Sequence, residues 1–332
     1  MAPGLGVDAP IWYAPGSVSH YVVIHNPVAG HGRARDRMRD AEQLLRRNDV
    51  GYELLVTEYP GHAIELARQA ALSNRCRAIV AAGGDGTANE VLNGMMQARL
   101  TGAAVPALGV LSIGRGNDFA YGAGLPTTIE SAVEALVGGS VATIDVGFLR
   151  GGVYPDGRYF GNGIGIGFDT IVGFEAAKLK RVRGFAGYLI GALKVLLLYY
   201  RAPLLTIRTD DGERAQPCIQ VSVMNGRRMG GGFHMAPDAR IDDGLLDICI
   251  AGSPRRFQMI ALFLRYLRGT QSGHPHISIC RTGSVSVVSD GAPLAIHADG
   301  ETISVDGTSL DVCLAGQMQV LRAADASDCR TP

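Results

Sequence analysis

The segment Gly83–Glu90, with the sequence GGDGTANE, contains the residue types needed to bind a polyphosphate. Glycines let the backbone approach phosphate oxygens, and the start of a helix supplies unpaired N–H groups and positive potential. Thr87 and Glu90 have capping-box spacing, which predicts a helix start at that point. Asp85 adds a carboxylate that could share Mg²⁺ with a nucleotide. A glycine-rich turn with a capped helix would explain the glycines and Thr87, but not a carboxylate inside the loop.

Two further glycine-rich segments follow apolar runs. Asn26–Gly32 (NPVAGHG) follows the run at 20–25 and precedes Arg33, and Gly114–Ala120 (GRGNDFA) follows the run at 106–113. The carboxyl ends of successive parallel strands lie along one edge of a sheet, so all three segments should converge. Together they predict a polyphosphate site, although none contains a Walker A lysine or a GxGxxG fingerprint.

Apolar and amphipathic segments alternate through the first half of the chain. Strands are predicted at 20–25, 52–57, 78–82 and 106–113, and helices at 33–48, 62–72, 88–97 and 127–137. Nearly continuous apolar strands between helices are typical of a parallel sheet covered on both faces. The first half is therefore predicted to be a Rossmann-like α/β domain.

The second half has a different pattern. Asp-Gly pairs occur at 156–157, 211–212, 243–244, 290–291, 299–300 and 306–307. Asp-Gly between β-branched runs predicts hairpins, and hence an antiparallel β-sandwich, interrupted by helices near 170–200 and 254–267. We expect a loose leader at 1–19, a nucleotide-binding α/β domain at 20–145 and a β-rich domain at 146–325. The active site should lie in the cleft between the two domains.

Composition narrows the class of protein. Lys+Arg and Asp+Glu are both 31 among 332 residues, which argues against a nucleic-acid binder that relies on a global positive field. The six cysteines are dispersed, mostly within apolar runs, which predicts reduced cysteines in a cytosolic protein. The eight histidines show no metal-ligand spacing. The first twenty residues have neither a basic nor an apolar signal-peptide region.

One apolar stretch, Phe185–Tyr200, requires a membrane interpretation. It is shorter than the ~20 residues of a membrane span, and Lys194 interrupts it. A buried helix is the simpler interpretation. The basic residues Lys178, Lys180, Arg181 and Arg183 precede the stretch, so an interfacial helix on anionic lipid is the alternative.

The glycine-rich segments together resemble the catalytic domain of diacylglycerol kinases, and most closely that of the soluble bacterial diacylglycerol kinase-like lipid kinases. The resemblance includes Thr57 with Gly61-His62-Ala63, Gly161–Asp169, Gly230–Phe233 with Asp243-Gly244, and Asp299-Gly300-Glu301. It runs from residue 21 to residue 322. GGDGT alone is shared with NAD kinases, and it is similar to the GGDGS of phosphofructokinases. NDFA, GGGF and DGE narrow the resemblance to lipid kinases.

The resemblance implies ATP and Mg²⁺ as cofactors and a lipid as acceptor. The residues that would hold ATP are Asn26, Pro27, Gly30, Arg33, Thr57, Gly83, Gly84, Asp85, Gly86, Thr87, Asn89, Glu90, Gly114, Arg115, Asn117 and Asp118. Asp85 and Asp118 would orient the phosphates through Mg²⁺. Asp299 and Glu301 would lie across the cleft, with Glu301 as the base for the lipid hydroxyl. A second metal site would use Asp243 and the carbonyls of Arg240 and Leu245.

Arg115 departs from the family pattern, which usually has Thr or Ser at this position of the GxGND turn. A hydroxyl contact to the nucleotide would be lost, while an arginine could pair with a phosphate. The substitution leaves the nucleotide geometry open.

The sequence is compatible with four functions. They are a kinase of diacylglycerol, a kinase of ceramide or sphingoid bases, an NAD kinase, and a lipid- or nucleotide-binding regulator without catalysis. The NDFA and GGGF segments count against an NAD kinase. The presence of all four candidate acids, Asp85, Asp118, Asp299 and Glu301, counts against a regulator without catalysis. The expected partners are a membrane lipid and the inner face of a membrane, contacted by a cytoplasmic enzyme through Lys178–Tyr200. A homodimer is also compatible with the sequence.

Overall fold

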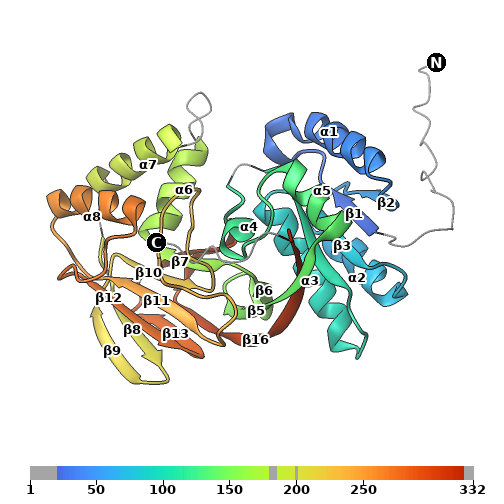
Figure 1. Ribbon diagram of the computed structural model, residues 1–332. Coiled ribbons are helices and arrows are strands. Elements are labelled where there is room, and N and C mark those ends of the chain that lie inside the picture. The colour runs from blue at the N-terminus through green and yellow to red at the C-terminus, as the bar shows by residue number, and fades with distance from the viewer. Residues whose placement is uncertain (1–20, 115, 179–184, 199–200, 325–332) are drawn as a thin grey trace, which may run out of the picture.

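The computed structural model of the chain describes residues 21–114, 116–178, 185–198 and 201–324. The leader expected at 1–19 and Arg115 lie outside the described residues. The described chain forms two sheets, with helices against both faces of one end of the first sheet and against the outer face of the second (Figure 1).

The first half contains the expected parallel sheet. Its strands are β1 (Tyr21–His25), β2 (Tyr52–Val56), β3 (Ala78–Gly83) and β4 (Ala107–Ser112), in the order β2-β1-β3-β4. One face packs on α1 (Ala34–Arg47) and α5 (Ile129–Gly138), and the other on α2 (His62–Ser73) and α3 (Asp85–Leu100). Every residue of β1, β3 and β4 is buried. The near-continuous apolar runs are explained by this burial on both faces.

The first sheet extends far beyond these four strands. The long strand β16 (Ser309–Arg322) pairs with β4, with β5 (Ser140–Gly151) and with β13 (Ser284–Ser289). The remaining strands are β6 (Tyr154–Phe160), β8 (Leu204–Thr209) and β9 (Gly212–Pro217). The boundary expected between residues 145 and 146 falls inside β5, so one continuous sheet joins the two halves.

The second sheet is antiparallel and lies wholly in the second half. Its strand order is β12 (Ile277–Thr282), β11 (Leu246–Ala251), β10 (Gln220–Met224), β7 (Gly163–Gly167), β14 (Leu294–Ala298) and β15 (Glu301–Gly307). An apolar cluster that includes Leu205, Val221 and Val285 joins it to the first sheet. The outer face is covered by α6 (Phe168–Lys178), α7 (Phe185–Leu198) and α8 (Arg256–Arg268). The predicted sandwich and both helical interruptions are confirmed.

Asp-Gly pairs mark some of the hairpins. Asp211-Gly212 connects β8 to β9, and Asp299-Gly300 connects β14 to β15. Asp156-Gly157 lies inside β6, so the hairpin predicted there is wrong. The turn between β5 and β6 instead uses Gly151 and Gly152, whose φ angles are 146° and 56°. Because two adjacent glycines tolerate positive φ, they displaced the turn from the Asp-Gly pair.

The helix start predicted at Thr87 is also wrong. Helix α3 begins at Asp85, with Gly84 as its N-cap and no side-chain capping bond. The Thr87 hydroxyl accepts a hydrogen bond from Asn26 Nδ2 at 3.1 Å instead. Glu90 accepts hydrogen bonds from the backbone N–H groups of Gly61 and Ala63, which start α2. The capping-box residues therefore join neighbouring elements rather than cap their own helix.

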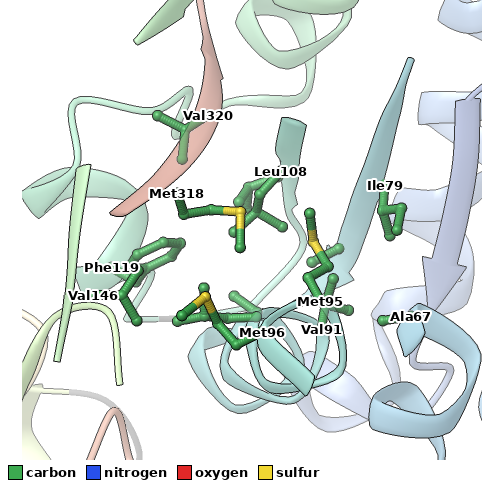
Figure 2. Close-up of a cluster of buried hydrophobic side chains, with 14 of the residues drawn as sticks. Ala67, Ile79, Val91, Met95, Met96, Leu108, Phe119, Val146, Met318 and Val320 are labelled. Atoms are coloured by element: carbon green, nitrogen blue, oxygen red, sulfur yellow. The ribbon is translucent and has the colours of Figure 1, made fainter. Parts of the chain in front are cut away.

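A core of apolar side chains fixes α3 against the sheet and the end of the chain. Figure 2 shows Met95 and Met96 of α3 beside Leu108 of β4, with Met318 and Val320 of β16. All five side chains are nearly inaccessible to solvent. Because α3 starts at the candidate site, this core sets the position of the residues described below.

Gly94 on α3 tests the close packing of α2 against α3. A Cβ at Gly94 would overlap the carbonyl oxygen of Ile64 and lie 2.8 Å from Ala67 Cβ. We expect Gly94→Ala to lower the free energy of unfolding by about 2 kcal/mol, measured by urea denaturation, because the helices must separate. Helix propensity alone would give the opposite sign. The control is Gly138→Ala on α5, where a Cβ meets nothing within 4 Å and stability should not fall.

Candidate functional site

The three glycine-rich segments meet at the carboxyl edge of the parallel strands, as predicted. The backbone N–H of Gly114 donates to the Gly83 carbonyl at 2.9 Å, and a Cβ at Gly114 would overlap Gly84. Gly30, with φ of 59°, leaves only 3.1 Å between a Cβ and the carbonyl oxygen of Ile113. The loops after β1, β3 and β4 therefore form a backbone-lined cradle. The N-terminus of α3 opens into the same region, which favours a bound anion.

Asp85 stands at the start of α3 and faces the loop after β4. Its Oδ1 accepts a hydrogen bond from Phe119 N–H at 3.0 Å, and Oδ2 lies 3.0 Å from the place of a Cβ on Gly116. Burial, followed by the charge of Asp118, raises the pKa of Asp85 to about 6, although the backbone N–H of Phe119 lowers it. Because burial and a neighbouring negative charge make the ionised form of Asp85 unfavourable, a cation bound nearby would stabilise it.

Asp118 joins the first half of the chain to the second. Its Oδ1 accepts from Arg228 Nε at 2.8 Å, and its Oδ2 accepts from the Gly231 N–H at 2.7 Å. The Arg228 guanidinium also lies over the ring of Tyr121, 3.8 Å from its centroid. The sequence predicted a metal-orienting role for Asp118 and missed Arg228. No local motif marks Arg228, because its partners are far away in the sequence.

Asp299 is a buried carboxylate with four hydrogen-bond donors. Oδ1 accepts from the N–H groups of Asn162 and Gly163, both at 3.0 Å. Oδ2 accepts from Gly161 N–H at 2.8 Å and from Asn89 Nδ2 at 2.9 Å. Asp299 itself has φ of 47°, a left-handed conformation that Asp adopts more readily than most residues. The side chain therefore ties the β14–β15 turn to the β6–β7 turn and to α3.

Asn89 and Glu90 support this arrangement from α3. Besides Asp299, Asn89 Nδ2 donates to the Tyr159 carbonyl, and Asn89 Oδ1 accepts from Arg158 Nε at 2.9 Å. Glu90 is bonded to the start of α2, as described above. In the structure, both predicted nucleotide-binding side chains are engaged by other parts of the protein.

Glu301 lies directly against the glycine-rich loop. A Cβ on Gly86 would lie 2.4 Å from Glu301 Oε1, so this carboxylate lies against the start of α3 and would have to shift if Gly86 carried a side chain. Burial raises the pKa of Glu301, and the charges of Glu90 and Asp299 raise it further. Arg158 opposes them and lowers the pKa. The structure thus brings Glu301 and Asp85 to the same helix end from opposite halves of the chain.

The other predicted residues line the cradle or its margin. Asn26 Oδ1 accepts from Val28 N–H, and Thr57 donates its N–H to the His25 carbonyl at 2.9 Å. Arg33 is exposed, and Asn117 has φ of 50°. Arg37, which no sequence motif marks, donates from Nη1 to the carbonyls of Ile113 and Gly114 and so supports the loop after β4. Only the helical spacing of α1 could have indicated its position.

The residues expected at the second metal site make hydrogen bonds and ion pairs within the protein. Asp243 Oδ2 pairs with Arg281 Nη2 at 2.6 Å, and Oδ1 accepts from Leu245 N–H at 3.2 Å. Arg240 pairs with Asp242 at 3.6 Å. Within the described ranges, no three His, Cys, Asp or Glu side chains cluster as metal ligands. These contacts do not test the predicted site, whose other ligands would be the backbone carbonyls of Arg240 and Leu245, so it stays a prediction.

Two protein-family models match the chain. The model described as "Diacylglycerol kinase catalytic domain" matches residues 20–149, and that described as "YegS C-terminal NAD kinase beta sandwich-like domain" matches residues 162–322. The "Probable lipid kinase YegS-like" of Chromohalobacter salexigens is 37% identical over 224 residues, 66% of this chain and 68% of that protein. This chain belongs to the diacylglycerol kinase-like lipid kinase family.

Other members of this lipid kinase family match over more of the chain. A diacylglycerol kinase of Mycobacterium tuberculosis is 29% identical over 288 residues, 86% of this chain and 89% of that protein. The crystal structure of a diacylglycerol kinase from Bacillus anthracis covers 92% of this chain and 96% of its own, at 21% identity and a TM-score of 0.68. Yeast NADH kinase complexed with NADH, at 11% identity, has a TM-score of 0.50 over 96% of this chain and 91% of its own. These structures show the shared fold.

Asp299→Asn tests the role of the buried carboxylate. An asparagine would direct its own N–H groups at donors that Asp299 now satisfies, leaving buried groups unpaired. We expect the free energy of unfolding to fall by about 3 kcal/mol, measured by urea denaturation. Asp306→Asn, at an exposed position of β15, is the matched control and should change little. Equal stability of the two variants would contradict the structural role.

Asp85→Asn tests the raised pKa of Asp85 through the pH dependence of protein stability. Because the folded-state pKa of Asp85 is raised to about 6, the folded protein binds a proton more tightly than the unfolded chain. Wild-type stability should therefore decrease as pH rises through the window between the two pKa values. The variant should be more stable than wild type by about 2 kcal/mol at pH 7, and the difference should vanish near pH 4. A pH-independent difference between the two unfolding free energies would contradict the assignment.

Proposed function

We propose that this protein transfers the γ-phosphate of ATP to the hydroxyl of a membrane lipid, with Mg²⁺, and that a diacylglycerol-like lipid is the favoured acceptor. The observation that carries the proposal is the contact between Glu301 and Gly86. It puts a carboxylate with a raised pKa at the N-terminus of the helix that opens into the glycine cradle. Phosphoryl transfer needs positioning, charge neutralisation and a proton acceptor, and this arrangement would supply all three.

The phosphates of ATP would lie in the cradle formed by the loops after β1, β3 and β4. Gly30, Gly84 and Gly114 allow the backbone to approach them closely. Asp85 is the carboxylate best placed to hold Mg²⁺, which would neutralise charge on the phosphates. Asp118 contributes by lowering the electrostatic potential around Asp85 and by holding the Arg228 side chain beside the cradle.

Glu301 would accept the proton as the lipid hydroxyl oxygen attacks the γ-phosphorus. The new bond joins that oxygen to phosphorus, and the bond from phosphorus to the β,γ-bridging oxygen breaks, so ADP leaves. Burial keeps the pKa of Glu301 above that of an ordinary glutamate, which makes it a better base than an exposed carboxylate. Arg158 opposes this rise, which favours the ionised form that can accept a proton.

An apolar cavity in the second half supports a lipid acceptor over a dinucleotide. The cavity has a volume of about 730 Å³ and lies between α6, α7 and the sheets. Its lining includes Phe168, Ile171, Phe174, Val195 and Leu294. Leu294 begins β14, the strand that leads into the turn before Glu301. The strand spans about 15 Å, so an acyl chain in the cavity could place its headgroup near Glu301.

The kinase assay compares acceptors directly. Labelled ATP with Mg²⁺ is offered with diacylglycerol, ceramide, sphingosine or NAD in mixed micelles, and transferred label is counted. We expect labelling of a lipid, with diacylglycerol preferred. Glu301→Gln should lower kcat by about 100-fold or more with little change in ATP binding, because only the proton acceptor is lost. Asp85→Ala should lower both kcat and the affinity for ATP.

Glu134→Gln, an exposed change on α5, is the matched control and should retain wild-type transfer. Labelling of ceramide or sphingosine alone would establish the alternative lipid kinase. Labelling of NAD alone would replace the lipid proposal with the fold-related nucleotide kinase. ATP binding without transfer to any acceptor would favour the regulator without catalysis.

We also propose that the enzyme works in the cytoplasm, in peripheral contact with the inner face of the membrane. Among the described residues, no helix is long and apolar enough to cross a bilayer. The candidate contact Lys178–Tyr200 includes Lys180, Arg181 and Arg183, which lie outside the described residues. Lys178 pairs with Glu175 at 2.6 Å, and Lys194 of α7 pairs with the same carboxylate at 2.5 Å. These two lysines neutralise the negative charge of Glu175, which would otherwise repel an anionic membrane beside this stretch.

A further inference from the structure

Helix α8 carries a stripe of apolar side chains on its outer face. Phe257, Ile260 and Leu264 are 66%, 57% and 46% exposed. The spacing of three and four residues places them on one face of the helix. The opposite face is buried through Met259, Leu262 and Tyr266, which belong to an apolar cluster against the sheet. Helix packing therefore accounts for the inner face and leaves the outer stripe unexplained.

The same helix carries positive charge and no negative charge. Arg255, Arg256, Arg265 and Arg268 are exposed at its two ends, and the helix contains neither Asp nor Glu. Arg265 also donates to the carbonyl of Thr270 at 3.0 Å, which leaves its charge in place near the C-terminal end. An apolar stripe between basic ends is typical of helices that lie in the interface of an anionic bilayer.

Helix α7 continues the apolar surface beside α8. Ile190 and Leu193 of α7 are 43% and 52% exposed. Phe263 of α8 packs against the cluster that contains Val195 of α7, so the two helices lie in contact. Figure 1 shows both helices at the same end of the molecule, on the outer side of the second sheet. The same helix α7 contributes Val195 to the lining of the apolar cavity described above.

We propose that the outer face of α8, together with the exposed residues of α7, is a docking surface for a bilayer with anionic headgroups. Phe257, Ile260 and Leu264 enter the acyl boundary, and the arginines contact the headgroup phosphates. A symmetric pair of chains is a poorer occupant, because a two-fold axis would bring the arginines of both α8 helices together. This docking surface rests on the proposed function in one respect, namely that the substrate is a membrane lipid.

The test is vesicle binding by the full chain, measured by co-sedimentation. Vesicles are phosphatidylcholine alone or phosphatidylcholine with about one third phosphatidylglycerol. The triple variant Phe257→Gln, Ile260→Gln, Leu264→Gln should bind the mixed vesicles at least about 10-fold more weakly than wild type. The control pair Leu100→Gln, Val137→Gln removes exposed apolar residues of α3 and α5 and should bind as wild type does. Wild-type binding by the triple variant would overturn the proposal.

Charge is tested separately by Arg256→Gln, Arg268→Gln. This double variant should lose the preference for phosphatidylglycerol while keeping part of its binding to neutral vesicles. An unchanged preference would show that the arginines play no role and would contradict the proposed contact. Thermal unfolding of each variant should match wild type, because the altered side chains are exposed.

Two further readouts separate the alternatives. If light scattering shows a wild-type dimer that the triple variant dissociates, while vesicle binding is unchanged, the surface joins two copies and the bilayer proposal fails. Transfer to a short-chain acceptor in detergent should be unchanged in the triple variant, because docking is not needed there. Absence of lipid labelling by wild type would remove the proposed kinase activity, yet the vesicle result would still decide the docking surface.

Discussion

The structure of the site depends on the buried carboxylate of Asp299. Four N–H groups point at it, three from the turn between β6 and β7 and one from Asn89 on α3. These donors come from both halves of the chain, and each would be costly to bury without an acceptor. The carboxylate thus fixes α3 relative to the β14–β15 turn, and Glu301 follows two residues later. The buried, fully hydrogen-bonded acid thus positions the acid that is proposed to react.

Near Asp299, the ionised forms of two other acids, Asp85 and Glu301, are made unfavourable by their surroundings. The pKa values of Asp85 and Glu301 are both raised, first by burial and then by neighbouring carboxylates. Such clustering lowers stability, and proteins retain it chiefly where charge is needed for function. A bound cation and an incoming phosphate group would change this balance. Arg228 and Arg158 supply only part of the neutralisation, at Asp118 and beside Glu301.

Much of this arrangement could be predicted from local sequence. Apolar strands, helical spacing and glycine-rich junctions depend on near neighbours, so the parallel sheet and the convergence of its three loops are confirmed. The partners of Glu90, Asn89 and Asp118 could not be predicted, because each pairs with a segment brought close only by folding. The helix start predicted from capping-box spacing was wrong for the same reason. Thr87 bonds to Asn26 and Glu90 bonds to the start of α2, so neither caps α3. Packing between elements decided these cases.

The return of β16 to the first sheet affects the order in which the chain can fold during synthesis. β4 and β16 become neighbours in the sheet, although about two hundred residues separate them in sequence. Until β16 leaves the ribosome, β4 presents an unpaired edge, and the core beneath α3 lacks Met318 and Val320. An exposed strand edge is a template for pairing with other chains. The nascent first half therefore has an open sheet edge and an incomplete core even though its three glycine-rich loops are already synthesised.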